Sequence, residues 1–348
     1  PEPERGTALA AGEPVLPRDE LEAHLAGIWQ DLLGVPSVGI RDGFFDLGGH
    51  SLLAVRLMSR IRVEMGRDLP LGTLFGASTV ESLAAVLRRE DAGERSPLVL
   101  IRPGEGTPLF LVHPVGGSVL CYRDLAQALG DRPVWALQSP ENPPSRLEEM
   151  AAAYLSALRP AQPQGPYRLA GWSMGGTLAY EMARQLRSQG EEVELLALID
   201  ASVPGAEGPV EVDNATLASW FARDLGGLAG RAIHLAPEGL RGLTPDAQVE
   251  RILETALAAG ALAPGFGSEE LRHHLELFRR NFRTLLSYVP GPYPAPLLAI
   301  VAAEAPADAA APWRSLASCV HEHRIPGDHY TLVQSPQVEE LARLLSTI

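Results

Sequence analysis

From residue 98 to the end of this 348-residue chain, short apolar segments alternate with amphipathic ones, and this alternation restricts the fold more than any other feature. Amphipathic, helix-like segments lie at 119–129, 146–158, 177–188 and 338–346. The apolar, strand-like segments are 98–101, 109–112, 134–137, 167–170, 195–199, 297–301 and 320–325. Such alternation is typical of a mostly parallel sheet covered by helices on both faces. We therefore expect an α/β domain over residues 98–348.

One interval interrupts the alternation. Residues 201–288 have no strand pattern and instead contain helical stretches at 215–225, 246–257 and 269–288. A helical insertion directly after a sheet strand is typical of a lid over the ligand-binding edge of the sheet. We expect such a lid over about residues 202–290, and a bundle that only pads the fold is the alternative.

The first part of the chain has a different pattern. Residues 1–17 are rich in Pro, Ala, Gly and Glu without an apolar period, which predicts a linker. Helical periodicity begins at Arg18, a second helix opens at Ser51, and Ser78-Thr79-Val80-Glu81 predicts a capping box for the last helix. We expect a small four-helix domain over residues 18–90 and a second linker over 91–97. The chain begins with proline, which suggests a piece of a longer protein.

The bulk composition excludes several functions. A formal net charge of −14 argues against nucleic acid as a partner, because phosphate backbones are bound by clustered basic residues. No apolar run approaches the roughly 18 residues of a membrane span, and a signal peptide is not evident. Cys121 and Cys319 are far apart and lack the spacing of metal ligands. We expect a cytoplasmic protein without a metal site, a disulfide or a membrane contact.

A glycine-rich turn carries the first chemical signal. Gly171-Trp172-Ser173-Met174-Gly175-Gly176 joins a strand-like segment to a helix-like one, which is the context of a G-x-S-x-G nucleophile turn. The turn is so tight that glycine is needed two places before and two places after the serine. The pattern predicts that Ser173 is the nucleophile of an acyl-transfer reaction. A glycine-rich turn without chemistry is the alternative.

A serine nucleophile of this kind requires a base and an acid later in the chain. Asp200 ends the strand-like segment that follows Ser173, and His329 lies in Gly327-Asp328-His329 after the last strand. His329 would take the proton from Ser173, and Asp200 would orient the imidazole and stabilise its charged form. Glu304 and Asp308 follow a later strand and are rival acids. We favour Asp200 because it terminates its strand cleanly.

The reaction also needs two backbone N–H groups directed at the developing oxyanion. One is expected from Met174, the residue after the nucleophile. The other is expected from the loop His113-Pro114-Val115-Gly116-Gly117, in which Val115 is the preferred donor. The predicted oxyanion hole therefore consists of Val115 and Met174.

Two resemblances cover nearly the whole chain beyond the first 17 residues. The run Asp42-Gly43-Phe44-Phe45-Asp46-Leu47-Gly48-Gly49-His50-Ser51-Leu52-Leu53 resembles the attachment motif of peptidyl carrier proteins from nonribosomal peptide synthetases. The larger part, with the His113, Ser173, Asp200 and His329 elements, resembles the thioesterase at the C-terminal end of such assembly lines. The first resemblance implies that Ser51 carries covalent 4′-phosphopantetheine. A helix N-terminus also favours the phosphate that this modification adds.

Together the resemblances imply a chain-terminating thioesterase with its carrier domain, folded as a four-helix bundle and an α/β-hydrolase. A peptidyl group would pass from the Ser51 thioester to Ser173 and leave by hydrolysis or by macrocyclisation, which the sequence does not distinguish. The implied partners are upstream condensation and adenylation domains, a phosphopantetheinyl transferase and the peptidyl substrate. The alternatives are a free-standing serine esterase fused to a helical module, and a carrier whose hydrolase has lost activity.

Overall fold

A computed structural model describes residues 15–89, 96–205, 212–262 and 265–347. The chain divides into two compact units, residues 1–94 and 95–348, and we describe each by itself. Most of the predicted linkers, residues 1–14 of the first and 91–95 of the second, lies outside the described residues. None of the helices in the described ranges has the length and apolarity needed to cross a bilayer.

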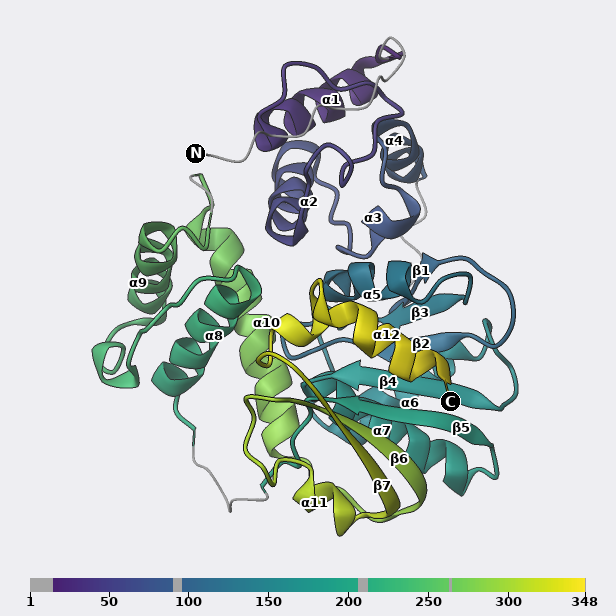
Figure 1. Ribbon diagram of the computed structural model, residues 1–348. Coiled ribbons are helices and arrows are strands. Elements are labelled where there is room, and N and C mark those ends of the chain that lie inside the picture. Colours follow the sequence, from purple (N-terminus) through teal and green to yellow (C-terminus); the bar gives the residue numbers. More distant parts are fainter. Residues whose placement is uncertain (1–14, 90–95, 206–211, 263–264, 348) are drawn as a thin grey trace, which may run out of the picture. The chain divides into compact units, whose positions relative to one another are not determined.

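The first unit is a bundle of helices α1 (Glu20–Leu33), α2 (Ser51–Met65), α3 (Thr73–Gly76) and α4 (Val80–Arg88), drawn in purple and blue in Figure 1. Its core contains Trp29 and Phe44, both fully buried, with ring centroids 5.1 Å apart in an edge-to-face arrangement. Four apolar residues of α2 face this core and are buried, namely Leu53, Leu57, Met58 and Ile61. The predicted helical bundle is therefore present.

The start of α4 differs from the predicted capping box by one residue. Thr79 is the N-cap, and its hydroxyl accepts a hydrogen bond from the Ser82 backbone N–H at 3.1 Å. The Ser82 hydroxyl completes the box by accepting from the Thr79 N–H, also at 3.1 Å. The prediction of a capping box between Ser78 and Glu81 was wrong, because Ser82 fills the third helical position and pairs with Thr79. The Glu81 carboxylate is therefore available for ion pairs.

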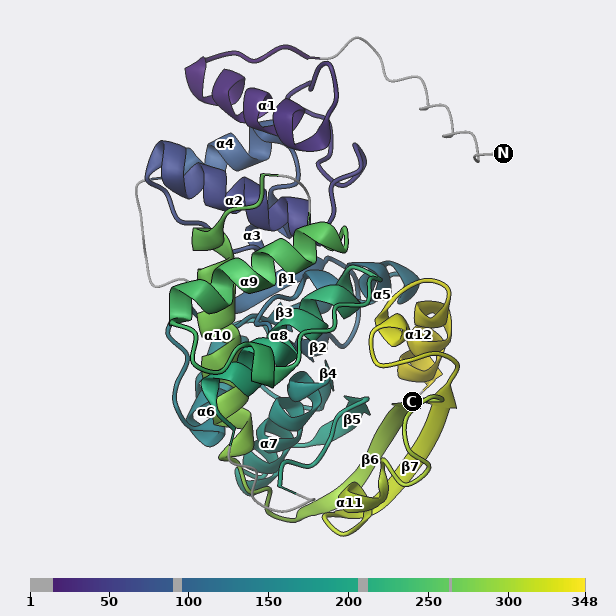
Figure 2. The same ribbon diagram turned by 90° about the vertical axis from the view of Figure 1, so that its left-hand side faces the viewer.

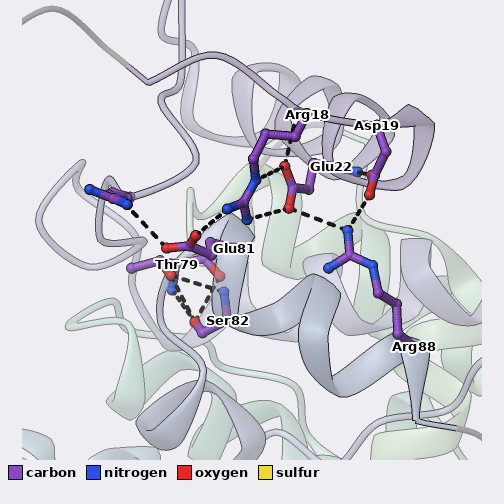
Figure 3. A network of polar contacts seen from close by, with 8 residues as sticks. Arg18, Asp19, Glu22, Thr79, Glu81, Ser82 and Arg88 are labelled. Atoms are coloured by element: carbon purple, nitrogen blue, oxygen red, sulfur yellow. Dashed lines mark hydrogen bonds and ion pairs between the residues drawn. The ribbon is translucent and has the colours of Figure 1, made fainter.

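Glu81 belongs to a network of charged side chains that joins the start of α1 to α4 (Figure 3). Arg18 pairs with Glu81 at 2.7 Å and with Glu22 at 2.7 Å. Glu22 is only 1% exposed and is also paired with Arg88 at 3.3 Å. Hydrogen bonds from Arg18 lower the pKa of Glu22 to about 2. This carboxylate therefore stays charged inside the bundle because two arginines surround it.

We expect Glu22→Gln to destabilise the first unit at neutral pH and to reduce its sensitivity to acid. Because the folded-state pKa lies below the ordinary value of 4.5, Glu22 stabilises the fold above about pH 4.5 and loses this effect towards pH 2. Solvent around the half-exposed Arg18 screens the pair. We expect a melting temperature lower by about 4–8 °C at pH 7, as for a loss of about 1 kcal/mol in a domain of this size.

Calorimetry of the full chain between pH 7 and pH 3 would measure the transition of the first unit. Glu20→Gln is the matched control, since Glu20 is an exposed acid in the same turn of α1. An equal loss in both variants would contradict a specific role of the network.

The second unit is built on a seven-stranded sheet, within the described residues, in the order β1-β3-β2-β4-β5-β6-β7. Strand β1 is antiparallel to β3, and all other neighbours are parallel. The strands are β1 (Leu98–Arg102), β2 (Leu109–Val112), β3 (Val134–Leu137), β4 (Tyr167–Trp172), β5 (Val193–Ile199), β6 (Tyr293–Ala302) and β7 (Ala317–Ile325). Each predicted strand is confirmed, and several extend further than their apolar core.

Helices cover both faces of the sheet. Helices α5 (Arg123–Ala128) and α12 (Gln337–Thr347) lie together on one face, and α6 (Leu147–Leu158) and α7 (Met174–Ser188) lie on the other (Figure 1). The short helix α11 (Ala311–Arg314) was not predicted, because four residues are too few to show a helical period. The fold is a mostly parallel α/β-hydrolase domain, as the sequence predicted.

Helices α8 (Asn214–Leu228), α9 (Pro245–Ala258) and α10 (Ser268–Leu286) form the insertion between β5 and β6. They pack against one another, and both views show them as a group on the side of the sheet (Figures 1 and 2). Phe221 of α8 meets Phe278 of α10 with ring centroids 5.5 Å apart. Helix α10 also contacts α7, the helix that begins directly after Ser173. The insertion therefore has a core of its own and packs against the helix that follows Ser173.

Candidate active site

Ser173 lies in the turn between β4 and α7, with φ 58° and ψ −128°. Such a conformation is strained for a residue with a side chain. A Cβ on Gly171 would lie 2.1 Å from Gly175 backbone atoms, and a Cβ on Gly175 would lie 2.1 Å from the carbonyl oxygen of Val112. The flanking glycines are thus required by close backbone packing, as the motif predicted.

The second member of the site, Asp200, directly follows β5 and also has a positive φ, 45°. Its Oδ2 accepts a hydrogen bond from Nδ1 of His329 at 2.6 Å, and its Oδ1 accepts one from the Ala302 N–H at 2.9 Å. Burial disfavours the charged carboxylate, but the bonds from His329 and Ala302 outweigh burial, so the pKa of Asp200 lies below its usual value. Asp200 is therefore a stable, oriented anion.

The two rival acids lie elsewhere. Glu304 and Asp308 are exposed, and neither is paired with His329 in the part of the chain that the structure describes. Because Nδ1 of His329 is bound to Asp200, Nε2 remains as the ring nitrogen that can accept a hydroxyl proton. The structure thus brings together Asp200 and His329 from segments 129 residues apart in sequence.

Trp172, the residue before Ser173, fixes the segment that carries His329. Its indole Nε1–H donates to the backbone carbonyl of His329 at 2.9 Å, and its ring lies 4.9 Å from the imidazole centroid. Its backbone N–H donates at 2.9 Å to the hydroxyl of Tyr122, which in turn donates to the Val112 carbonyl at 2.5 Å. Trp172 therefore connects the nucleophile turn both to the histidine loop and to the end of β2.

The loop 113–117 follows β2 and contains one of the two predicted oxyanion donors. Gly117 has φ 79°, and its N–H donates to the Pro114 carbonyl at 2.8 Å. Within the described residues, neither the Val115 nor the Met174 backbone N–H donates to a protein acceptor. Both groups are thus available to a bound oxygen atom.

The imidazole of His113 stabilises this loop as a neutral ring. Burial lowers the pKa of His113 to about 4. Its Nδ1 lies 2.7 Å from the Pro114 carbonyl, which can only accept, so Nδ1 carries the proton. Its Nε2 then accepts from the hydroxyl of Tyr154 at 2.6 Å. His113 therefore acts on the loop shape and is not a base for the reaction.

Asn281, in α10 of the insertion, contacts the same loop from the other side. Its side chain is fully buried, its Nδ2 donates to the Val115 carbonyl at 2.9 Å, and its Oδ1 accepts from the Ser139 hydroxyl at 3.3 Å. The Val115 carbonyl can only accept, which fixes the orientation of the amide. The insertion thus holds the loop through one hydrogen bond.

Sequence reasoning missed Trp172, Tyr122 and Asn281. The partners of Asn281 lie 166 and 142 residues away in sequence, and no local pattern marks such contacts. A single polar residue on the apolar face of an amphipathic helix is the one signal that could have drawn attention to Asn281.

The attachment site predicted in the first unit is at the start of a helix. Ser51 is the first residue of α2, whose first turn has no acidic residue and whose N-cap, His50, makes no side-chain capping bond. The free N–H groups and the helix dipole suit a phosphate, so these residues fit a phosphopantetheine group. Gly48 has φ 94°, and a Cβ on Gly49 would lie 2.4 Å from the Phe44 ring. Gly49 is therefore required by packing inside the bundle.

No group of three or more His, Cys, Asp or Glu side chains among the described residues is arranged to hold a metal ion. The arrangement of Ser173, Asp200 and His329 suits acyl transfer, in which a hydroxyl attacks and an imidazole takes its proton.

We expect Gly175→Ala to destabilise the second unit strongly, because its Cβ would overlap the Val112 carbonyl oxygen at 2.1 Å. A forced backbone shift of this kind costs about 1–3 kcal/mol or more. Calorimetry of the full chain measures the loss. Gly239→Ala is the control, since nothing lies within 4 Å of its Cβ and it should change stability by at most about 0.5 kcal/mol. Similar stability of the two variants would refute the packing argument.

Both units match known protein families. Residues 107–348 match the thioesterase domain family, and residues 23–87 match the phosphopantetheine attachment site family. The chain is 33% identical over 363 aligned residues to chondramide synthase of Chondromyces crocatus, covering 97% of this chain and 9% of that protein. It is 45% identical over 211 residues to a dimodular nonribosomal peptide synthase of Bacillus subtilis, covering 58% of this chain and 9% of that protein.

Solved structures give the same result. A four-domain nonribosomal peptide synthetase in its holo form, bound to AMP and glycine, matches 99% of this chain and 27% of its own length, with TM-score 0.69 and 34% identity. The NocB thioesterase domain from the nocardicin cluster matches 69% of this chain and 92% of its own, with TM-score 0.50 and 27% identity.

The chain thus spans less than a tenth of the two curated relatives described above. Over its own length, the order of the two matched regions agrees with the helical bundle followed by the α/β-hydrolase fold. The chain belongs to the thioesterase domain family, and its thioesterase domain is preceded by a domain for covalent attachment of 4′-phosphopantetheine.

Proposed function

We propose that this chain ends a nonribosomal peptide synthetase and releases its product. A peptidyl group held as a thioester on the phosphopantetheine arm of Ser51 is transferred to Ser173 and is then released by hydrolysis or macrocyclisation. The observation that carries the proposal is the 2.6 Å hydrogen bond between His329 and Asp200, on loops at the same edge of the sheet as the strained turn of Ser173. The unpaired N–H groups of Val115 and Met174 support it.

In this mechanism Nε2 of His329 takes the proton of the Ser173 hydroxyl as the serine oxygen attacks the thioester carbonyl. Asp200 stabilises the resulting imidazolium through Nδ1. The carbonyl oxygen becomes an anion and accepts hydrogen bonds from the Val115 and Met174 N–H groups. His329 then protonates the leaving thiolate, which gives a peptidyl ester on Ser173. Water, or an amine or hydroxyl of the peptide, attacks this ester with His329 again as the base.

The first domain would hold 4′-phosphopantetheine on the Ser51 hydroxyl, with the phosphate at the start of α2. When bound, the group supplies a thiol that carries the acyl chain as an activated thioester. A carrier joined to the thioesterase in one chain keeps the acyl group at high local concentration, so transfer needs little intrinsic affinity. A free-standing esterase gains nothing from such a domain, and this separates our proposal from that alternative.

We further propose the domain limits 18–90 for the carrier and 98–348 for the thioesterase, with the insertion at about 202–290 acting as a lid. Condensation and adenylation domains would precede the chain, and a phosphopantetheinyl transferase would modify it. The protein would act in the reducing cytoplasm without a membrane or nucleic-acid partner. Two cysteines that are free in the structure, Cys121 and Cys319, are consistent with this compartment.

The test loads the protein with a phosphopantetheinyl transferase and a peptidyl coenzyme A, and follows intact mass and released product. The unaltered protein should gain the peptidyl arm, lose the peptide again, and release an acid or a product lighter by one water. Ser173→Ala should keep the peptide on the first domain, and Ser51→Ala should gain no mass. Loading without release by the unaltered protein would favour an inactive hydrolase. Failure to load, with release of soluble esters, would favour the esterase.

The hydrogen bond from Asn281 to the loop 113–117, called the oxyanion loop below, gives a further prediction. Asn281→Asp has nearly the same shape but directs a second oxygen at the Val115 carbonyl, so the loop should shift. Loss of one oxyanion donor lowers kcat by about 10²–10³-fold, and we expect about 10-fold or more from this indirect change, with little change in KM. Steady-state hydrolysis of a peptidyl N-acetylcysteamine thioester measures both constants.

Thr284→Val is the matched control for Asn281. Thr284 is buried in the same helix, but its hydroxyl donates to the carbonyls of Pro144 and Ser145, away from the loop 113–117. We expect its kcat to stay within about twofold of the unaltered protein, since only a weak neutral hydrogen bond is lost. An unchanged kcat in the aspartate variant, or an equal loss in the control, would exclude the positioning role of Asn281.

A further inference from the structure

Asp224 is an acid that the mechanism above does not use, and it lies beside the reacting groups. It belongs to α8 of the insertion and is partly buried. Its Oδ2 is 3.9 Å from the position of a Cβ on Gly116, the residue after Val115. The carboxylate is therefore next to the loop 113–117.

The same carboxylate also lies close to the histidine loop, because it interacts electrostatically with His329 and Tyr330. One turn further along α8, a Cβ on Gly227 would lie 2.3 Å from the Tyr330 ring. Because glycine has no side chain, α8 can pack directly against that ring. Residues three apart share one helix face. Asp224 is thus near both the loop of Val115 and the loop of His329.

No cationic side chain of the described residues forms an ion pair with Asp224. The neighbouring Arg223 is exposed and acts electrostatically on Tyr330. Burial raises the pKa of Asp224 to about 6, against opposing effects of His329 and Tyr330, so the group is mainly a carboxylate at neutral pH. A negative charge beside the oxyanion loop disfavours the oxyanion of the reaction. The oxyanion at such a site is more stable when a bound group supplies a positive charge next to the carboxylate.

We propose that Asp224 forms a subsite for a cationic group of the acyl chain, an ammonium or guanidinium close to the thioester carbonyl. The inference rests on the proposed function, because it assigns the substrate class of the same site. The cation would pair with the carboxylate, remove its repulsion of the oxyanion, and orient the chain between the two loops. Asp224 is in this view a specificity-determining residue supplied by the insertion.

The test compares two peptidyl N-acetylcysteamine thioesters that differ only in the residue next to the thioester, lysine or norleucine. The unaltered protein should prefer lysine by about 10-fold or more in kcat/KM, as for a partly desolvated charge pair. Asp224→Asn should lose activity on the lysine substrate and gain a few-fold on the norleucine substrate, because the repulsive charge is gone. The preference should then disappear or reverse.

Glu250→Gln is the matched control, an exposed acid on α9 whose loss changes the net charge equally. It should keep the full preference for lysine. In the unaltered protein, raising the salt concentration should reduce the preference, since salt screens a charge pair, and this measurement does not depend on the folding of any variant. An unaltered protein without a preference, or a preference that neither salt nor Asp224→Asn reduces, would overturn the proposal.

A further pair of substrates separates the two sources of such a cation within one peptide. One places the amine in the side chain next to the thioester, and the other places it only at the distant N-terminus. Stimulation by the first alone supports side-chain recognition. Stimulation by the second with a cyclic product identifies the recognised cation as the amine that, after giving a proton to His329, attacks the ester on Ser173. If neither substrate of any pair is turned over and Ser173 is never acylated, the proposed function fails, whereas turnover without charge preference overturns only the subsite.

Discussion

The site depends on one close approach, that of the first turn of α7 to the end of β2. Gly175 lies against the Val112 carbonyl so tightly that a single methyl group would overlap it. The loop 113–117 begins directly after Val112, so this approach brings the N–H groups of Val115 and Met174 to the same end of the sheet as Ser173. Ser173 and the predicted oxyanion donors thus share one packing constraint.

Buried polar side chains then hold the surrounding loops in fixed shapes. His113, Tyr122, Trp172 and Asn281 each bind a backbone carbonyl near the site, and all four are almost fully buried. In each case the carbonyl can only accept, so the proton positions follow from the geometry. Fully satisfied networks of this kind are rigid, and rigid donors stabilise charge without a reorganisation cost at the moment of reaction. The chemistry requires a few residues, but their positions depend on these supports.

Much of the fold could be predicted because the strands are short runs of buried apolar residues, and the ends of those strands locate Ser173, Asp200 and His329. The roles of these three residues are predictions. Trp172, Asn281 and Asp224 could not be found in this way, since their partners lie in segments far away in sequence. The α4 cap was misplaced by one residue because serine and glutamate both suit the third helical position of a capping box, and Ser82 fills it here.

The hydrogen bond from Trp172 to the His329 carbonyl restricts how this protein can be altered. It joins two positions 157 residues apart, one inside the nucleophile turn and one on the loop that presents the imidazole. The G-x-S-x-G pattern allows any residue before the serine, but replacing Trp172 in this chain would remove this hydrogen bond. Replacing the segment from β7 to α12 with that of a relative also replaces the loop whose His329 carbonyl accepts the hydrogen bond from the Trp172 indole. Chimeras divided between these two segments should be built so that both halves of the contact come from one parent.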